Sequence, residues 1–480
     1  MDGAAATSRA PKPVVLYPSP GMGHLVSMIE LGKVFAARGL AVTVVVVDPP
    51  YGNIGETGPF LAGVSAANPA ITFHRLPKVR VPPVASKHPE TLTFEVARLS
   101  NPSLRNLLAG ASPAVLVVDF FCNAALEVAD ELGVPAYMFC TSGAEILAFF
   151  LYLPVLHAQA TVNLGDMGEE LVHAPGIPSF PATHAVLPLM ERNDPAYAEF
   201  LKAATDLCRV QGFLVNTFRS LEPRAVETMA AGSCTPPGVP TPPVYCIGPL
   251  IKSEEVGENR GEECLAWLDT QPNGSVVFLC FGSIGQFSAE QIKEVAAGLE
   301  ASGQRFLWVV RSPPSDDPAK NFDKPPEPDL DALLPKGFLE RTKDRGLVVK
   351  SWAPQRDVLV HAAVGGFVTH CGWNSVLESI MAGVPMLAWP LYAEQRMNRV
   401  FLEKEMGLAV AVEGYDGEGP VKAEEVAAKV RWLMESDGGR ALLERTLAAM
   451  RQAKEALRDG GESEATLARL VESWREAASG

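Results

Sequence analysis

The chain has 480 residues, which is more than one typical hydrophobic core needs, so at least two domains are expected. Hydrophobic residues make up 47 % of it, which indicates a folded globular protein and excludes a largely disordered one. The formal net charge of −15 makes nucleic acid and anionic membranes poor partners for its surface.

The cysteines and the N-terminal residues predict a cytoplasmic protein. The eight cysteines form no Cys-x-x-Cys pair and most lie in apolar segments, so we expect reduced thiols rather than disulfides or a zinc site. Residues 1–13 lack the apolar core of a signal peptide. The best candidate for a membrane span, residues 134–156, is interrupted by Glu145 and Pro154. We interpret it as a buried strand followed by a helix.

The first segments of the chain form a βαβ unit. Residues 14–17 are an apolar strand, residues 18–24 a tight loop with helix from residue 25, and residues 41–47 a second strand. The loop places Gly21 and His24 at the carboxyl end of the first strand, where α/β proteins bind ligands. The nearby helix start disfavours a protonated imidazole, so His24 is a candidate general base; the alternative is a residue that only caps the helix.

The next strands end in further candidates. Asp119 follows the apolar strand at residues 115–118, where it would face the same crevice unless it only caps a helix. Thr141 follows the strand at residues 134–139. Two long loops, residues 78–89 and 165–195, are candidates for the wall of a binding site for a small molecule, together with Phe121 and Phe200. Phe149 is a further candidate, although a Phe in such an apolar helix is more often a core residue.

The second half repeats the alternation of strand and helix. We expect residues 1–250 to form one domain, residues 251–263 a polar linker, and residues 264–460 a second domain, with residues 461–480 forming a last helix. A strand at residues 275–281 is closed by Gly282 and Ser283, where a glycine allows the backbone to approach a phosphate and Ser283 can donate to it.

Residues 352–395 contain the densest set of polar candidates. A buried strand at residues 365–369 leads into His370, and Asn374 and Ser375 open a helix whose free N–H groups form a site for phosphate. Glu378 lies one turn further on the same face and can accept both hydroxyls of a ribose. Trp352 offers a flat ring to a base, and Glu394 with Gln395 follows the next strand and turn.

This stretch resembles the signature box of plant UDP-dependent glycosyltransferases. The resemblance rests on Trp-Ala-Pro-Gln from Trp352, His-Cys-Gly-Trp-Asn-Ser from His370, Glu378, and the closing acid–Gln pair, which is commonly Asp-Gln in the family. It implies the GT-B fold, an α/β architecture in which two Rossmann-like, doubly wound parallel-sheet domains face each other across a cleft. The implied UDP-sugar ligands are Thr141, Ser283, Trp352, Ala353, Gln355, His370, Trp373, Asn374, Ser375, Glu378, Glu394 and Gln395.

The family's chemistry implies a role for each remaining candidate. His24 would take the proton of the acceptor hydroxyl while Asp119 supports the imidazolium, and Gln395 would favour glucose over galactose. The implied acceptor-binding residues are Gly21, Phe121, Phe149, Phe200 and Tyr392. No acidic metal-binding pair stands at a strand end, so we expect a metal-independent enzyme without a cofactor, acting as a monomer.

The resulting expectation is inverting transfer of glucose from UDP-glucose to a hydroxyl of a small hydrophobic acceptor, such as a flavonoid or another phenol. A C-glycosyltransferase acting on a phenolic ring and a non-catalytic nucleotide-sugar-binding protein remain alternatives. An NAD-dependent oxidoreductase is disfavoured because Gly21 and Gly23 are not followed by the third glycine of a dinucleotide fingerprint. A glycoside hydrolase is disfavoured because no pair of catalytic carboxylates is evident.

Overall fold

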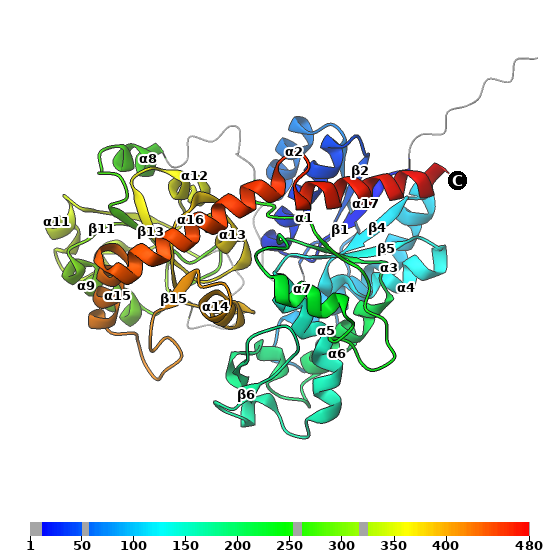
Figure 1. Cartoon of the computed structure of the whole chain (residues 1–480), viewed down its shortest axis with the longest axis horizontal. Helices are drawn as coiled ribbons and strands as arrows, with labels where there is room; N and C mark the ends of the chain where they lie inside the picture. Colours follow the sequence, from blue (N-terminus) through cyan, green and yellow to red (C-terminus); the bar gives the residue numbers. More distant parts are fainter. Residues whose placement is uncertain (1–11, 50–56, 253–261, 316–324, 480) are drawn as a thin grey trace, which may run out of the picture.

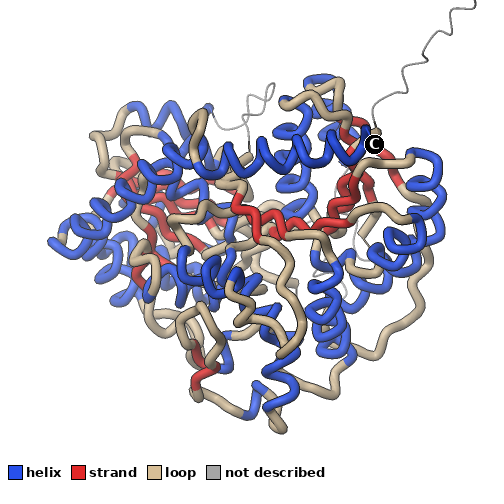
Figure 2. The backbone as a smooth tube through the Cα atoms, turned by 45° about the vertical axis from the view of Figure 1, so that its right-hand side comes forward, coloured by secondary structure: helices blue, strands red, loops and turns tan. Residues whose placement is uncertain are grey.

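Two parallel sheets, each covered by helices, form two lobes in the computed structural model (Figures 1 and 2). The structure describes residues 12–49, 57–252, 262–315 and 325–479. Most of the predicted linker, residues 253–261, and the first eleven residues therefore lie outside the described residues. The architecture confirms the expected GT-B fold, and the proposed domain boundaries remain predictions.

The N-terminal lobe contains a seven-stranded parallel sheet. Its strands are short and apolar because both faces are covered, as the fully buried sequence Val-Val-Leu-Tyr of β1 shows. The order across the sheet is β3 (Ile71–Arg75), β2 (Val42–Val46), β1 (Val14–Tyr17), β4 (Val115–Val118), β5 (Ala136–Cys140), β8 (Phe213–Val215) and β9 (Val244–Cys246). The helices of this lobe are α1 (Met22–Ala37), α2 (Thr57–Ala67), α3 (Glu90–Ala111), α4 (Ala125–Leu132), α5 (Ala144–Gln159), α6 (Pro195–Asp206) and α7 (Pro223–Ala230).

The C-terminal lobe repeats the design with six parallel strands. Their order is β12 (Gly346–Lys350), β11 (Arg305–Val310), β10 (Val276–Cys280), β13 (Val364–Thr369), β14 (Met386–Ala388) and β15 (Ala409–Ala411). Its helices are α8 (Glu262–Asp269), α9 (Ala289–Ser302), α10 (Leu330–Leu333), α11 (Phe338–Thr342), α12 (Gln355–Val360), α13 (Trp373–Ala382), α14 (Gln395–Lys404), α15 (Ala423–Glu435) and α16 (Asp437–Leu457).

Strand order places the ends of particular strands side by side. In the first sheet β1 pairs with β4, and Tyr17 is level with Val118. In the second sheet β10 pairs with β13, and Cys280 is level with Thr369. In each lobe the chain leaves these two neighbours in opposite directions across the sheet, which makes a crevice at their carboxyl ends. Helix α13, which follows β13, lies on the side of its lobe that faces the N-terminal lobe (Figure 1), and its first turn contacts α1 there.

Two segments differ from the sequence-based expectation. The predicted loop at residues 165–195 contains a short antiparallel hairpin, β6 (Leu171–Val172) with β7 (Phe180–Pro181). The interrupted apolar stretch contains β5 and α5, as expected, and no helix in the described ranges has the length and hydropathy of a membrane span. All eight cysteines are free thiols, and seven of them are buried.

The last helix, α17 (Glu462–Ser479), packs on the N-terminal lobe (Figure 1). It contributes Leu467, Leu470, Val471 and Trp474 to the core that covers one face of the first sheet. The Trp474 ring lies edge-on to Phe35 and Tyr137, with centroids 5.3 and 5.1 Å away. The Ser463 hydroxyl donates to the carbonyl of Gly248 at 2.6 Å, which fixes the start of the helix.

Replacing Trp474 with Ala should lower the thermal unfolding midpoint of the N-terminal lobe. The ring is 3 % exposed, and truncation of a buried Trp costs about 3–5 kcal/mol. Differential scanning calorimetry measures the change. Trp352→Ala is the matched control, because that ring is 45 % exposed and its loss should leave the midpoint of the ligand-free protein unchanged. Equal midpoints for Trp474→Ala and the parent protein would contradict the packing argument.

Candidate active site

The pairing of β1 with β4 brings His24 and Asp119 together. Asp119 directly follows β4, and His24 lies in the first turn of α1, which starts three residues earlier than the sequence suggested. His24 Nδ1 lies 2.8 Å from Asp119 Oδ2. An ionised carboxylate only accepts, so the Nδ1–H donates and the lone pair of the neutral ring is on Nε2. The side chain of His24 is 34 % exposed, whereas that of Asp119 is 1 % exposed.

A serine that the sequence analysis missed completes this arrangement. The Ser19 hydroxyl donates to Asp119 Oδ1, the same oxygen that accepts from the Phe121 N–H at 3.4 Å. Ser19 is 2 % exposed. Its position in the turn after β1, five residues before His24, is the signal that could have identified it. The buried carboxylate is therefore held on both oxygens, one of them by the candidate base.

The pKa of His24 differs in direction from the expectation. Burial lowers it, but the charge and hydrogen bond of Asp119 and the charge of Glu394 together raise it above its ordinary value. The prediction that the surroundings of His24 would disfavour its protonated form is wrong in direction, because the two carboxylates outweigh the effect of burial on its pKa. His24 is therefore mostly neutral, and able to accept a proton, only when the pH exceeds this raised pKa.

Aromatic rings form the wall beside His24. The Phe121 ring lies edge-on to the His24 ring at 5.6 Å, and Phe121 and Phe120 are half-buried. Phe200 packs against both at 5.8 and 5.7 Å but is 4 % exposed. Phe149 is fully buried against Phe150 and Phe180, so it belongs to the core rather than to an acceptor surface. Phe120 was missed, although it is adjacent to Phe121 in the sequence.

The pairing of β10 with β13 creates the corresponding site on the opposite lobe. His370 follows β13 and faces Gly282, which follows β10. A Cβ at position 282 would lie 2.5 Å from His370 Nε2, and Gly282 has a φ of +77°, so only glycine fits. Ser283, beside it, is exposed and available to a ligand. The close approach brings two strand ends and an imidazole to one point.

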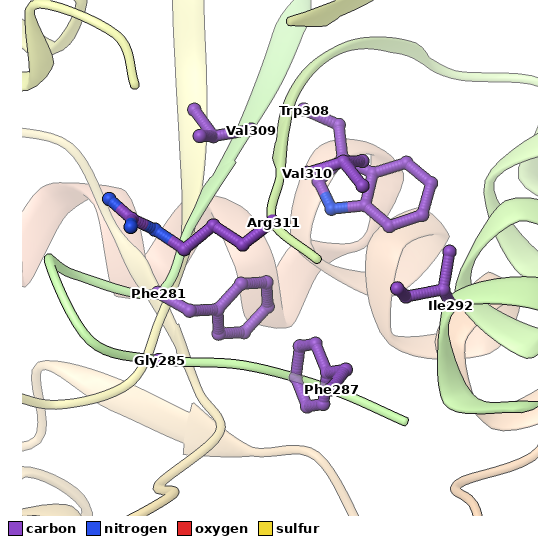
Figure 3. Close-up of a pocket in the computed structure, with 8 residues that line it drawn as sticks. All are labelled: Phe281, Gly285, Phe287, Ile292, Trp308, Val309, Val310 and Arg311. Atoms are coloured by element: carbon purple, nitrogen blue, oxygen red, sulfur yellow. The ribbon is translucent and has the colours of Figure 1, made fainter. Parts of the chain in front are cut away.

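His370 is a neutral ring in this structure. It is 5 % exposed, and burial together with the charge of Arg311 lowers its pKa to about 4. Arg311 follows β11, and its guanidinium extends away from Ile292 and the other apolar residues of a small cavity (Figure 3). His370 therefore offers a hydrogen bond to a phosphate without a positive charge of its own. The charge at this point comes from Arg311 and from the start of α13.

The residues predicted to bind the nucleobase and the ribose lie near the start of α13. Trp352 is 45 % exposed and presents an open ring, while Ala353 is 5 % exposed. The Gln355 Nε2 amide, at the start of α12, donates to Ser375 Oγ at 2.9 Å and to Glu378 Oε2 at 2.6 Å. Burial raises the pKa of Glu378, and the hydrogen bond from Gln355 opposes this shift. The structure thus brings Gln355, Ser375 and Glu378 together, and the binding of a nucleotide by these residues and by Trp352 stays a prediction.

The first turn of α13 also contacts the N-terminal lobe. Trp373 is 4 % exposed, and its indole N–H donates to the carbonyl of Asn216 at 2.7 Å. A Cβ at Gly143 would lie 2.9 Å from this ring, so the close contact requires glycine there. The indole N–H is therefore committed to the other lobe, and binding of the UDP-sugar by Trp373 stays a prediction. Asn374 likewise contacts Ser27 of α1.

The acid–Gln pair and its neighbours lie at the same seam. Glu394 is half-buried, and its Oε1 accepts from the Ser142 hydroxyl at 3.2 Å, next to the half-buried Thr141. Gln395 is 2 % exposed, and its Oε1 accepts from the N–H groups of Leu391 and Tyr392, both at 3.0 Å. Its carbonyl is therefore already occupied.

Two further predicted acceptor residues can be placed. Tyr392 lies beside His370, with ring centroids 5.9 Å apart, so the structure puts it on the phosphate side rather than with the Phe cluster. Gly21 is the residue before α1 and has a φ of +134°, in the turn that presents His24. Within the described ranges, no group of three or more His, Cys, Asp or Glu residues could hold a metal ion.

Comparison with known proteins identifies the family. The profile described as UDP-glucoronosyl and UDP-glucosyl transferase matches residues 253–416. Phloretin 2'-O-glucosyltransferase of Malus domestica is 46 % identical over 96 % of this chain and 99 % of its own length. The chain belongs to the plant UDP-glycosyltransferases. It is accordingly an enzyme that transfers a hexose, and the donor of that hexose is a UDP-sugar.

Two further family members support this assignment. Anthocyanidin 5,3-O-glucosyltransferase of a Rosa hybrid cultivar is 44 % identical over 96 % of this chain and 99 % of its own. A Phytolacca americana glycosyltransferase, solved with UDP-2fluoro-glucose and pterostilbene, has a TM-score of 0.85 and 37 % identity, covering 96 % of this chain and 99 % of that one. The fold and most of the length are therefore shared with these transferases.

Asp119→Asn should change the pH dependence of the transferase. Its charge and hydrogen bond raise the pKa of His24, so their loss lowers that pKa and moves the acidic limb of kcat/KM to lower pH. The plateau rate should also fall, by about 10²- to 10⁴-fold, because the imidazolium loses its support. A pH–rate profile measures both. An acidic limb at the parental pH would show that Asp119 does not control the base.

Proposed function

We propose that this transferase moves glucose from UDP-glucose to a phenolic hydroxyl with inversion at the anomeric carbon. The observation that supports it most is the His24–Asp119 pair: Nε2 of His24 has no hydrogen-bond partner among the described residues, and Ser27, three residues further along α1, contacts Asn374 of the other lobe. Relatives named for phloretin and anthocyanidin glucosylation support a phenolic acceptor. That the enzyme works as a cytoplasmic monomer stays a prediction.

His24 starts the reaction as the general base. Its Nε2 takes the proton of the acceptor hydroxyl while the Nδ1–H remains bonded to Asp119, so the imidazolium forms beside a buried carboxylate. The acceptor oxygen attacks the anomeric carbon, and the bond from that carbon to the UDP oxygen breaks with its electron pair leaving on the diphosphate. Attack opposite to the leaving group inverts the anomeric centre.

The leaving diphosphate gains its negative charge at the start of α13. Free N–H groups of that helix, Ser375 and the neutral His370 can donate to it, and Gly282 allows the chain to approach closely. Arg311 adds a positive charge near enough to influence His370. Preorganised donors of this kind stabilise developing charge without the reorganisation that water requires.

The acceptor surface suits a flat aromatic molecule. Phe121 lies edge-on to the base, and Phe94, Phe120 and Phe200 support it with ring contacts of 5.0 to 5.8 Å. Aromatic rings favour such edge-on and tilted arrangements, so a phenol could continue the same pattern. A phenolic hydroxyl is also more acidic than an aliphatic one, which suits deprotonation by an imidazole.

Two substitutions should separate chemistry from donor binding. His24→Ala should reduce transfer by at least about 10²-fold while calorimetry shows parental UDP affinity, because the base does not hold the nucleotide. Glu378→Ala should weaken UDP binding by about 10- to 100-fold, because a charged acceptor for the ribose is lost. Each variant is the control for the other. Normal turnover by His24→Ala, or unchanged UDP affinity in Glu378→Ala, would overturn the respective assignment.

Activity should survive removal of divalent metal ions. The donors around the start of α13 and Arg311 supply the stabilisation that a metal gives in other transferases. Initial rates with UDP-glucose and a phenol such as phloretin should be unchanged after dialysis against EDTA, with mass detection of the glucoside. A rate that disappears with EDTA and returns with Mg²⁺ or Mn²⁺ would contradict this scheme.

A further inference from the structure

Ser27 connects the helix that carries the base with the helix that receives the donor. It lies on α1, three residues after His24, and is 3 % exposed. The Asn374 Nδ2 amide, in the first turn of α13, donates to Ser27 Oγ at 3.0 Å. These two residues are 347 positions apart in the chain and belong to different lobes. The contact therefore crosses the catalytic seam.

The hydrogen bonds assign the orientation of the Asn374 amide. Ser27 Oγ lies 2.9 Å from the carbonyl of Gly23 and 3.3 Å from Asn374 Oδ1. A hydroxyl has one proton, and the shorter contact directs it to Gly23, so Ser27 can only accept from Asn374. The amide nitrogen therefore points toward Ser27. The second N–H has no acceptor among the described residues and is available for a ligand.

This orientation matters because the two ends of an amide have opposite polarity. Asn374 is half-buried at the start of a helix whose cap, Gly372, has no side chain to occupy the first N–H groups. A diphosphate at that start is attracted by an amide N–H and repelled by an amide carbonyl. Without a partner, the amide can rotate and present either end.

We propose that Ser27 is a positioning residue for the donor. Its hydroxyl fixes the Asn374 amide so that an N–H faces the diphosphate, which makes the N-terminal lobe a part of the donor site. This inference rests on the proposed binding of the diphosphate at the start of α13. It assigns Ser27 no contact with the reacting atoms and no part in proton transfer.

A double-mutant cycle on the full-length enzyme tests the inference, with UDP as the probe. Ser27→Ala should raise the Kd for UDP by about 3- to 10-fold, which is the usual effect of one hydrogen bond. Asn374→Ala should raise it at least as much, and the double variant should match Asn374→Ala alone. The KM for UDP-glucose should rise in Ser27→Ala while kcat stays within about twofold, because the His24–Asp119 pair is unaltered.

Matched measurements separate this role from a structural one. Alanine is a better helix former than serine, so the thermal midpoint of Ser27→Ala should stay at the parental value. Thr228→Ala is the control, because its hydroxyl makes the same one-turn bond, to the carbonyl of Arg224 at 2.7 Å, on an exposed helix face. Its UDP affinity should equal that of the parent.

Two results would overturn the inference, and they have different meanings. Parental UDP affinity in Ser27→Ala, or an equal further loss when it is added to Asn374→Ala, would show that Ser27 does not act through Asn374. Weakened binding in Asn374→Ala would then still support the donor site. Parental UDP affinity in Asn374→Ala would instead remove the placement of the diphosphate at Asn374, and with it this inference, whereas the assignment of His24 and Asp119 would stand.

Discussion

The active site depends on which strands are neighbours in each sheet. Because β1 pairs with β4, the residues that follow these strands meet, and an imidazole reaches a carboxylate 95 positions away at 2.8 Å. Because β10 pairs with β13, Gly282 meets His370 in the same manner. In each lobe the crevice forms where the chain leaves two neighbouring parallel strands in opposite directions. The proposed reaction uses the crevices of both lobes.

Contacts of α13 and α14 hold the two crevices in register. Trp373 inserts its indole against Gly143 and Asn216 of the first lobe, and Glu394 accepts from Ser142. Residues of α14 also enter the core of the N-terminal lobe, where Phe401 meets Phe180 at 6.3 Å. Donor recognition and acceptor activation therefore share one interface. Glu394 illustrates this, because a residue of the donor lobe raises the pKa of the base.

Local patterns were sufficient to predict the fold and the candidates at strand ends. Apolar strands followed by a polar residue identified His24, Asp119 and His370, since carboxyl ends of parallel strands meet at one edge. The signature stretch likewise predicted Gln355, Ser375 and Glu378, which the structure joins by hydrogen bonds.

Residue properties that depend on distant contacts could not be predicted. The burial of Trp373 and the raised pKa of His24 depend on groups brought together across the lobes. Ser19 was missed because its partner Asp119 lies 100 positions away, and Ser27 because its partner is in the other lobe. Phe149 shows the opposite case, since a row of Phe in a helix does not reveal which ring faces the core.

The chain passes between the lobes twice, and the two passages are joined. It leaves the first lobe after Leu250, whose N–H and carbonyl are both bonded to the Asn216 side chain, and returns at α17. There Ser463 is bonded to Gly248, two residues before Leu250. Both connections therefore leave the N-terminal lobe from one place. Any change in the angle between the lobes has to be accommodated beside Gly248 and Ser463, since the hydrogen bond between them ties the two connections to each other.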